Sequence, residues 1–142
     1  MKKKVSLLLF LFTITTLLSQ NIKHYEGKVE IDAKNHLLKA SFTISFNSLP
    51  RENSMKFFIH RSTKDLKVRS GKRNIKTTIV NEEFVEKDHA ITFDKSSILN
   101  NKLQIAYSLN LDSLSNNGFK YHKNWIELNL YTAWYPINTK YG

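Results

Sequence analysis

Residues 37–46 read Leu-Leu-Lys-Ala-Ser-Phe-Thr-Ile-Ser-Phe, and this run is the clearest guide to the fold. From position 38 onward every second residue is apolar, and the residues between them are lysine, serine or threonine. Side chains of a β-strand point alternately to the two faces of a sheet, so this period predicts a strand with one buried and one solvated face. A shift by one residue would expose all the apolar side chains together, so the pattern also predicts the register. These side chains are Leu38, Ala40, Phe42, Ile44 and Phe46.

A second alternating run precedes this strand. Residues 25–32 read Tyr-Glu-Gly-Lys-Val-Glu-Ile-Asp, and the linking residues 33–36, Ala-Lys-Asn-His, have the composition of a turn. Two alternating runs joined by a short polar turn predict a β-hairpin. We therefore expect residues 25–46 to form one antiparallel pair.

The rest of the chain continues as shorter runs of the same kind. Apolar residues recur at alternate positions, or nearly so, in residues 55–59, 66–68, 75–79, 84–85, 91–93, 103–111 and 126–130. After position 20 no stretch keeps the period of an amphipathic helix, and residues 96–101 are expected to form a loop or one helical turn. The spacing of the runs at residues 75–79, 84–85 and 91–93 is typical of a meander. We predict an all-β fold, either an antiparallel β-sandwich or a saddle-shaped sheet assembly.

The amino terminus has the pattern of a secretory signal peptide. Three lysines at positions 2–4 precede an apolar run at residues 5–18, and Ser19 and Gln20 follow it. A membrane anchor is the alternative, but this run is shorter than the roughly 20 apolar residues that a spanning helix needs. We expect residues 1–19 to be a signal-peptide helix that is removed. The product would have no stable membrane span and would be exported to the periplasm, the cell surface or the medium.

Residues 20–142 are expected to form a single all-β domain. A segment of this length buries one ordinary core, and the chain has no cysteine that could form a disulfide or carry a lipid. The last predicted strand runs into an aromatic-proline corner, Trp134-Tyr135-Pro136, and only six residues follow. Such a corner normally leads into further structure, so we expect the domain to be truncated at its carboxyl end.

The chain is basic, with a formal charge of +10 that falls to +7 when residues 1–19 and their three lysines are removed. The basic residues are densest in residues 64–76. Net charge acts as a long-range field, so an exported basic surface could hold lipid phosphates or acidic glycans; a solvated surface is the alternative. No sustained basic run occurs, and nucleic acid is not an expected partner. The candidate anion patch consists of Lys67, Arg69, Lys72 and Arg73.

No catalytic or metal-binding motif accompanies this charge. The five histidines include no His-Glu-x-x-His pair, which would place two imidazoles around a zinc ion. No Gly-x-Ser-x-Gly elbow and no glycine-rich phosphate loop is present. We therefore expect no cofactor and no enzymatic activity from this chain as it stands.

Aromatic residues near the carboxyl end form a second candidate surface, because exposed aromatic side chains anchor protein or sugar partners. The predicted strand at residues 126–130 carries apolar side chains on parts of both faces, so its second face is expected to be covered by a partner. For Trp134 the alternative is that its side chain packs in the core. The candidate partner surface consists of Trp125, Tyr131, Trp134 and Tyr135.

The order of these segments resembles a known family. The runs at residues 25–32 and 37–46 are followed by Phe-Phe-Ile-His at 57–60, Leu-Lys-Val at 66–68 and Trp-Tyr-Pro at 134–136. This order is similar to the amino-terminal β domain of M1-type, aminopeptidase N-like metallopeptidases. In that family a saddle-shaped sheet assembly precedes a thermolysin-like catalytic domain.

The resemblance implies a fold and a context, but no active site. The family's His-Glu-x-x-His zinc helix and Gly-x-Met-Glu-Asn loop belong to the catalytic domain, and neither motif occurs here. One hypothesis is therefore an exported, non-catalytic domain that packs against a catalytic metallopeptidase domain or another protein. The other is a stand-alone, secreted β-sandwich module that binds a glycan, an envelope component or a protein.

Overall fold

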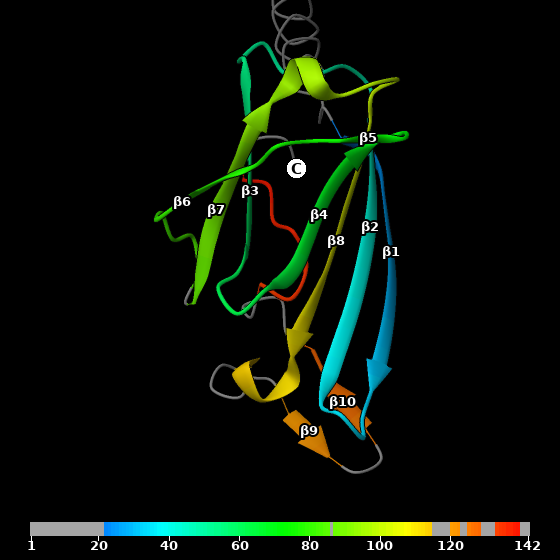
Figure 1. Cartoon of the computed structure of the whole chain (residues 1–142), viewed down its shortest axis with the longest axis vertical. Coiled ribbons are helices and arrows are strands. Elements are labelled where there is room, and N and C mark those ends of the chain that lie inside the picture. The colour runs from blue at the N-terminus through cyan, green and yellow to red at the C-terminus, as the bar shows by residue number, and fades with distance from the viewer. Residues whose placement is uncertain (1–21, 86, 115–119, 123–124, 129–132, 140–142) are drawn as a thin grey trace, which may run out of the picture.

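The computed structural model describes residues 22–85, 87–114, 120–122, 125–128 and 133–139, and within this part the regular structure is mainly β-strand. Figure 1 shows the arrangement of the elements. The strands are β1 (Ile22–Asp32), β2 (Leu37–Phe46), β3 (Ser54–His60), β4 (Lys64–Ser70), β5 (Arg73–Asn74), β6 (Thr78–Val80), β7 (Asp88–Asp94), β8 (Lys102–Asn110), β9 (Lys120–His122) and β10 (Trp125–Glu127). Two short 3-10 helices, η1 (Lys95–Ser97) and η2 (Leu111–Leu114), flank β8. The all-β prediction is confirmed, and η1 supplies the helical turn expected within residues 96–101.

The predicted hairpin is present in the predicted register. β1 and β2 pair antiparallel, with Gly27 opposite Phe42 and Val29 opposite Ala40. The five alternating apolar side chains of β2 are all buried in the core. A Cβ atom on Gly27 would lie 2.6 Å from the Phe42 ring, so the glycine leaves the space that this ring occupies.

The meander expected at residues 75–93 is present in part, because β6 and β7 are consecutive antiparallel neighbours. The large sheet has a less local strand order. In the large sheet the strand order is β1-β2-β8-β4-β5, so β8 lies between β2 and β4 although it follows both in sequence. β8 pairs with nearly the whole of β2, with Ile105 opposite Phe42. An alternating pattern tells which face of a strand is buried, but it does not tell which strand lies beside it. The long strand β2 is matched by β8, which is the other long strand available for its free edge.

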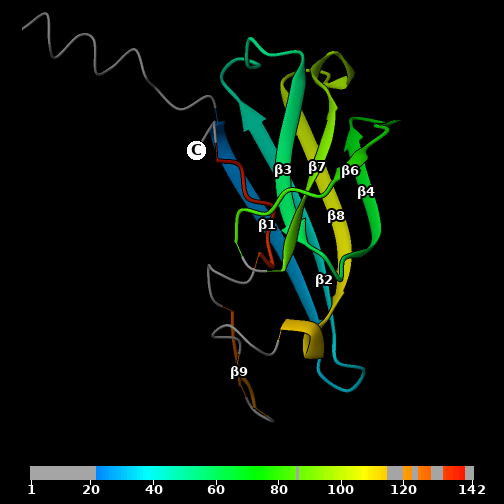
Figure 2. The ribbon, with the colours of Figure 1, turned by 90° about the vertical axis from the view of Figure 1, so that its left-hand side faces the viewer.

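The small sheet has the order β3-β7-β6 and lies in front of the large sheet in Figure 2. Side chains from both sheets meet in one shared core, in which the Phe57 and Phe93 rings stack at 6.1 Å. The strand expected at residues 84–85 is absent, because these residues lie in a loop. Their backbone N–H groups donate to the Asp88 carboxylate instead of a neighbouring strand.

The segment at residues 133–139 lies along the free edge of β3. The backbone groups of Phe58 and Ile137 exchange two hydrogen bonds of 2.8 Å, and His60 N–H donates to the Ala133 carbonyl. The Tyr25 hydroxyl on β1 donates to the Pro136 carbonyl, so the segment also reaches the edge of the large sheet. It therefore closes one side of the two-sheet structure (Figure 1).

The predicted signal peptide lies outside this description. Residues 1–19, the expected signal peptide, are not among the described residues. No helix in the described ranges has the length and apolar character needed to cross a bilayer.

Candidate functional site

The aromatic corner packs back onto the core. The Trp134 ring lies 6.2 Å from the Phe42 ring and 5.3 Å from the Tyr135 ring, and both corner side chains are half-buried. The Trp134 carbonyl accepts a 2.6 Å hydrogen bond from the Tyr107 hydroxyl. The indole Nε1 is buried and has no hydrogen-bond partner among the described residues. The corner is thus attached to both β8 and β2.

The other two aromatic candidates cannot be placed beside this corner. Trp125 begins β10, which pairs with β9, but its side chain is outside the described part of the chain. Tyr131 is not among the described residues. Of the predicted partner surface, only Trp134 and Tyr135 are shown together, and the role of the set stays a prediction.

The four residues of the candidate anion patch lie along one edge of the large sheet. Lys67 and Arg69 are on β4, Arg73 is on β5, and Lys72 is in the turn that joins them, where Gly71 has a φ of 58°. All four side chains are exposed. The β4–β5 hairpin therefore brings the predicted residues to one edge.

Three more charged residues extend this patch. Lys64 and Lys76 are also exposed, and residues 64–76 contain six basic residues and one acid. That acid, Asp65, accepts a 2.8 Å hydrogen bond from the Ser108 hydroxyl. The segment carries a formal charge of +5, which is most of the +7 expected for residues 20–142. We call residues 64–76 the basic edge.

A small cavity lies within the basic edge. It has a volume of about 240 Å³. The Arg69 Nε group donates a 2.9 Å hydrogen bond to the Asn74 side-chain oxygen, which fixes the plane of the guanidinium group. Ile75 N–H donates to the Val68 carbonyl and holds the two walls of the cavity together. The lining residues are Leu66, Lys67, Val68, Arg69, Asn74, Ile75 and Thr77.

Basic side chains in and next to the small sheet form ion pairs, unlike those of the basic edge. There Lys56 pairs with Glu82, and Arg61 pairs with Glu83. In the described part of the chain, by contrast, no carboxylate lies within salt-bridge distance of the six basic side chains of the basic edge. Among the described residues, the basic side chains of that edge are therefore not held in ion pairs.

The loop between β6 and β7 presents an exposed aromatic ring that the sequence analysis missed. Phe84 is 55% exposed, and one side of its ring lies 5.6 Å from the ring of buried Phe58. Asp88, which is fully buried, accepts 2.9 Å hydrogen bonds from the backbone N–H groups of Phe84 and Val85. These two hydrogen bonds hold the backbone at Phe84 and Val85 in place, with the Phe84 ring at the surface.

Further apolar surface lies beside this ring. Val80 and Phe58 flank Ala90 on neighbouring strands, so they share the outer face of the small sheet, and Val80 is 37% exposed. Ile79 on the same edge strand is 63% exposed and points to the opposite face from Val80. The signal in the sequence was the acidic surroundings of the Phe-Val pair, in Glu82-Glu83-Phe84-Val85-Glu86, which fit an exposed position better than a strand. We call Ile79, Val80 and Phe84 the apolar edge.

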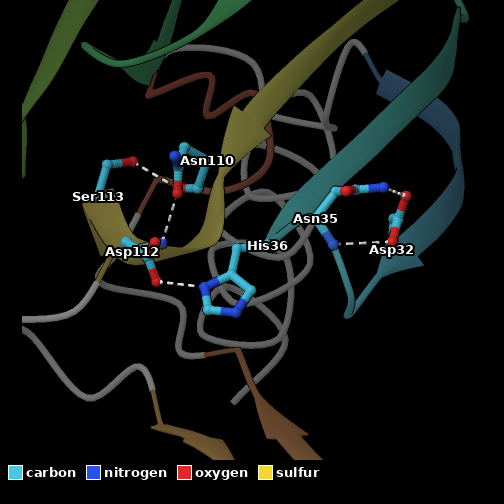
Figure 3. Close-up of polar contacts among 6 residues, drawn as sticks. All are labelled: Asp32, Asn35, His36, Asn110, Asp112 and Ser113. Atoms are coloured by element: carbon cyan, nitrogen blue, oxygen red, sulfur yellow. Dashed lines mark hydrogen bonds and ion pairs between the residues drawn. The ribbon is translucent and has the colours of Figure 1, made fainter.

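One polar cluster has the residue types of a catalytic pair. His36 Nδ1 lies 2.9 Å from Asp112 Oδ1, and both side chains are largely exposed. The nearby Ser113 hydroxyl donates to the Asn110 carbonyl, and Figure 3 shows it turned away from the His36 ring. His36 also accepts Leu111 N–H at its carbonyl, so these contacts join the β1–β2 turn to η2. The pair has a structural role in this arrangement.

Asp32 and Asn35 close the same turn from its other side. The Asn35 backbone and side-chain N–H groups both donate to the Asp32 carboxylate, which lowers the pKa of that carboxyl group (Figure 3). Within the described residues no group of three or more His, Asp or Glu side chains is arranged to hold a metal ion.

Comparisons with protein-family models, with curated proteins and with solved structures found no match to this chain.

Proposed function

We propose that this chain is an exported, non-catalytic β-sandwich domain that docks on a partner protein, as the amino-terminal domain of an M1-like zinc aminopeptidase docks on its catalytic domain. The observation that supports docking is the fixed, exposed ring of Phe84. Large aromatic side chains dominate the binding energy of many protein interfaces. A ring that is already ordered loses little conformational entropy when it enters a partner's pocket.

The apolar edge supports the same proposal. Val80 extends the apolar surface on the face of the small sheet that carries Phe58, and Ile79 adds an exposed apolar side chain on the opposite face of β6. The outer backbone edge of β6 is not paired in the described sheet. Exposed apolar groups that lie together are typical of interaction surfaces. The ion pairs of Lys56 with Glu82 and of Arg61 with Glu83 form a polar border to the loop.

The choice of an M1-like catalytic domain as the partner rests on the strand order in the sequence. The proposal includes the saddle-shaped form of the sheets, removal of residues 1–19 and export. Reading the DNA that follows and surrounds the codon for Gly142 is a direct test. An in-frame or adjacent His-Glu-x-x-His sequence supports the proposed partner, and unrelated neighbouring genes count against it.

A binding experiment tests the surface itself. The protein is titrated with the M1-like catalytic domain encoded in the same genome, and binding is followed by calorimetry. Phe84→Ser is expected to weaken binding at least about tenfold, because it removes a central aromatic anchor. The matched control is Leu99→Ser, since Leu99 is also a large exposed apolar side chain, at 45%, but lies outside the apolar edge. Equal weakening by the two variants, or no binding of the unaltered protein, would contradict the proposal.

The second candidate function is a stand-alone binding module for a glycan, an envelope component or a protein. The basic edge favours it, because its six exposed basic side chains form no salt bridge with a carboxylate in the described part of the chain. A measurable affinity of the isolated protein for an anionic ligand, with no partner domain present, would support this candidate over the first.

A further inference from the structure

We propose that the cavity in the basic edge binds a phosphate monoester group, carried either by a lipid headgroup or by a small soluble molecule. This inference deepens the second candidate function by naming its ligand class. It does not depend on docking through the apolar edge, because the two sites share no residue. Failure of either proposal therefore leaves the other standing.

The geometry of Arg69 carries the argument. Its Nε group donates to Asn74, so the guanidinium plane is fixed, while its terminal amino groups have no described acceptor. A planar guanidinium group binds two oxygens of a phosphate at once, which an ammonium group cannot do. Asn74 acts here as a positioning residue for Arg69.

The other lining residues fit the same ligand. Lys67 is two residues from Arg69 on the same strand, so both side chains lie on the same face of β4. Lys67 supplies a point charge, and the Thr77 hydroxyl supplies a neutral donor. Two cations suit a group that carries close to two negative charges near neutral pH.

The size and apolar lining of the cavity separate this ligand from polymers. A volume of about 240 Å³ is smaller than the roughly 300–1,000 Å³ of ordinary ligand pockets, so it suits one headgroup rather than a chain. Its apolar lining residues are the aliphatic Leu66, Val68 and Ile75. Single-stranded nucleic acids and many sugars require aromatic side chains for stacking, and this lining has none.

Titration with inorganic phosphate tests the site. The amide signals of Lys67, Arg69, Asn74 and Thr77 in a ¹H–¹⁵N NMR spectrum are expected to shift together, and the affinity should fall as salt is raised. Arg69→Gln is expected to weaken binding about tenfold, because it removes a charge-assisted contact. Lys28→Gln is the matched control: it removes one charge from an exposed position on β1, outside the cavity, and should change the affinity less than about twofold.

Two further variants separate the roles of charge and position. Arg69→Lys keeps the charge but loses the two-point contact, so it should bind more weakly than the unaltered protein. Asn74→Ala should weaken binding and shift the Arg69 Nε–H signal, which a merely structural role would not require. Thermal melts check that each variant is folded.

The source of the phosphate is distinguished by a second arm. Phosphatidylcholine vesicles with and without phosphatidic acid are compared in a flotation assay. Binding to phosphatidic acid that Arg69→Gln abolishes indicates a lipid headgroup, whereas binding to inorganic phosphate alone indicates a soluble ligand. Absence of shifts at the lining residues, or equal weakening by Arg69→Gln and Lys28→Gln, would overturn the proposal.

Discussion

The Tyr25 hydroxyl donates a 2.6 Å hydrogen bond to the carbonyl oxygen of Pro136, across 111 positions of the chain. Tyr107 makes the equivalent bond to the Trp134 carbonyl, also at 2.6 Å. Burial raises the pKa of both phenols, and the neighbouring Tyr135 and Tyr25, respectively, add to the effect. Both hydroxyls therefore stay protonated donors at neutral pH. These two bonds attach the closing segment at residues 133–139 to the large sheet.

Removal of either hydroxyl should loosen this segment. Tyr25→Phe and Tyr107→Phe each leave a carbonyl without its donor, and each should lower the free energy of unfolding by about 1–3 kcal/mol. Tyr107 is the more deeply buried and should give the larger loss. Urea titrations measure the effect.

Tyr135→Phe is the control, because no hydrogen bond of the Tyr135 hydroxyl is found among the described residues; its effect should stay within about 0.5 kcal/mol. The double variant of Tyr25 and Tyr107 should deviate from additivity, since both bonds hold the same segment. Strict additivity would mean that the two ends of the segment are held independently.

Trp134→Ala should destabilise the protein by about 2–4 kcal/mol, somewhat less than for a fully buried tryptophan. The ring is half-buried against Phe42, so truncation removes packing from the core. Trp134→Phe keeps a ring and removes an N–H group that has no described acceptor, so it should cost less than Trp134→Ala. Thermal melts decide between the two roles considered for Trp134: an unchanged melting temperature in Trp134→Ala would favour a partner-binding surface.

The alternating pattern was sufficient for the hairpin, because only one register buries Leu38, Phe42 and Ile44 together. The same pattern could not place β8 between β2 and β4, since alternation carries no information about neighbours. The pattern also gave a wrong prediction at Phe84, where it indicated a strand. The backbone N–H group of Phe84 donates instead to the buried carboxylate of Asp88, 4 residues later. Local preference was overridden there by a tertiary contact.

The candidate sites were predictable to a different extent. The basic residues of β4 and β5 could be chosen from their density in the sequence, but the cavity could not. It exists because the hairpin places Asn74 opposite Arg69 and because Ile75 bonds to Val68. The exposure of Phe84 was not predicted because it depends on the hydrogen bonds to Asp88. An alternating pattern does not show that Asp88 accepts these bonds.

Register is tested by a pair of adjacent substitutions. Phe42→Asp buries a carboxylate between the rings of Tyr25, Tyr107 and Trp134, and it should unfold the protein. Thr43→Asp lies on the outer face, where it is opposite Glu26, and cross-strand repulsion should cost about 0.2–1 kcal/mol. Thermal melts compare the two, and similar melting temperatures would show that the register is wrong.

Asp88→Ala should release the loop that holds Phe84. The substitution removes the acceptor of two backbone N–H groups and should destabilise the protein by about 2–4 kcal/mol. Hydrogen exchange of the Phe84 and Val85 amides should become faster than in the unaltered protein, and this acceleration should exceed that of the β2 amides. Asp94→Ala is the control, because Asp94 is an exposed carboxylate that accepts only the local Ser96 N–H group. Unchanged exchange at Phe84 in Asp88→Ala would show that the carboxylate does not hold the loop.

Stability should fall as the pH is lowered from about 6.5 because of His60. Burial lowers the pKa of its imidazole to about 4, and the positive charges of Lys87 and His89 contribute. The neutral ring accepts the Ser62 N–H group at Nδ1, which a protonated ring cannot do. In the unfolded chain the pKa is about 6.5, so between these values the unfolded state binds the proton and the folded state does not.

The free energy of unfolding at pH 5 should be lower than at pH 7 by up to about 2 kcal/mol. Urea titrations at each pH measure this difference. His89, whose pKa burial also lowers, acts in the same direction. His60→Gln keeps an acceptor for Ser62 but does not titrate, so it should remove at least half of the pH dependence. His24→Gln, at an exposed position on β1, should leave the dependence unchanged. If His60→Gln lost stability as steeply as the unaltered protein between pH 7 and 5, the proton would be taken up elsewhere.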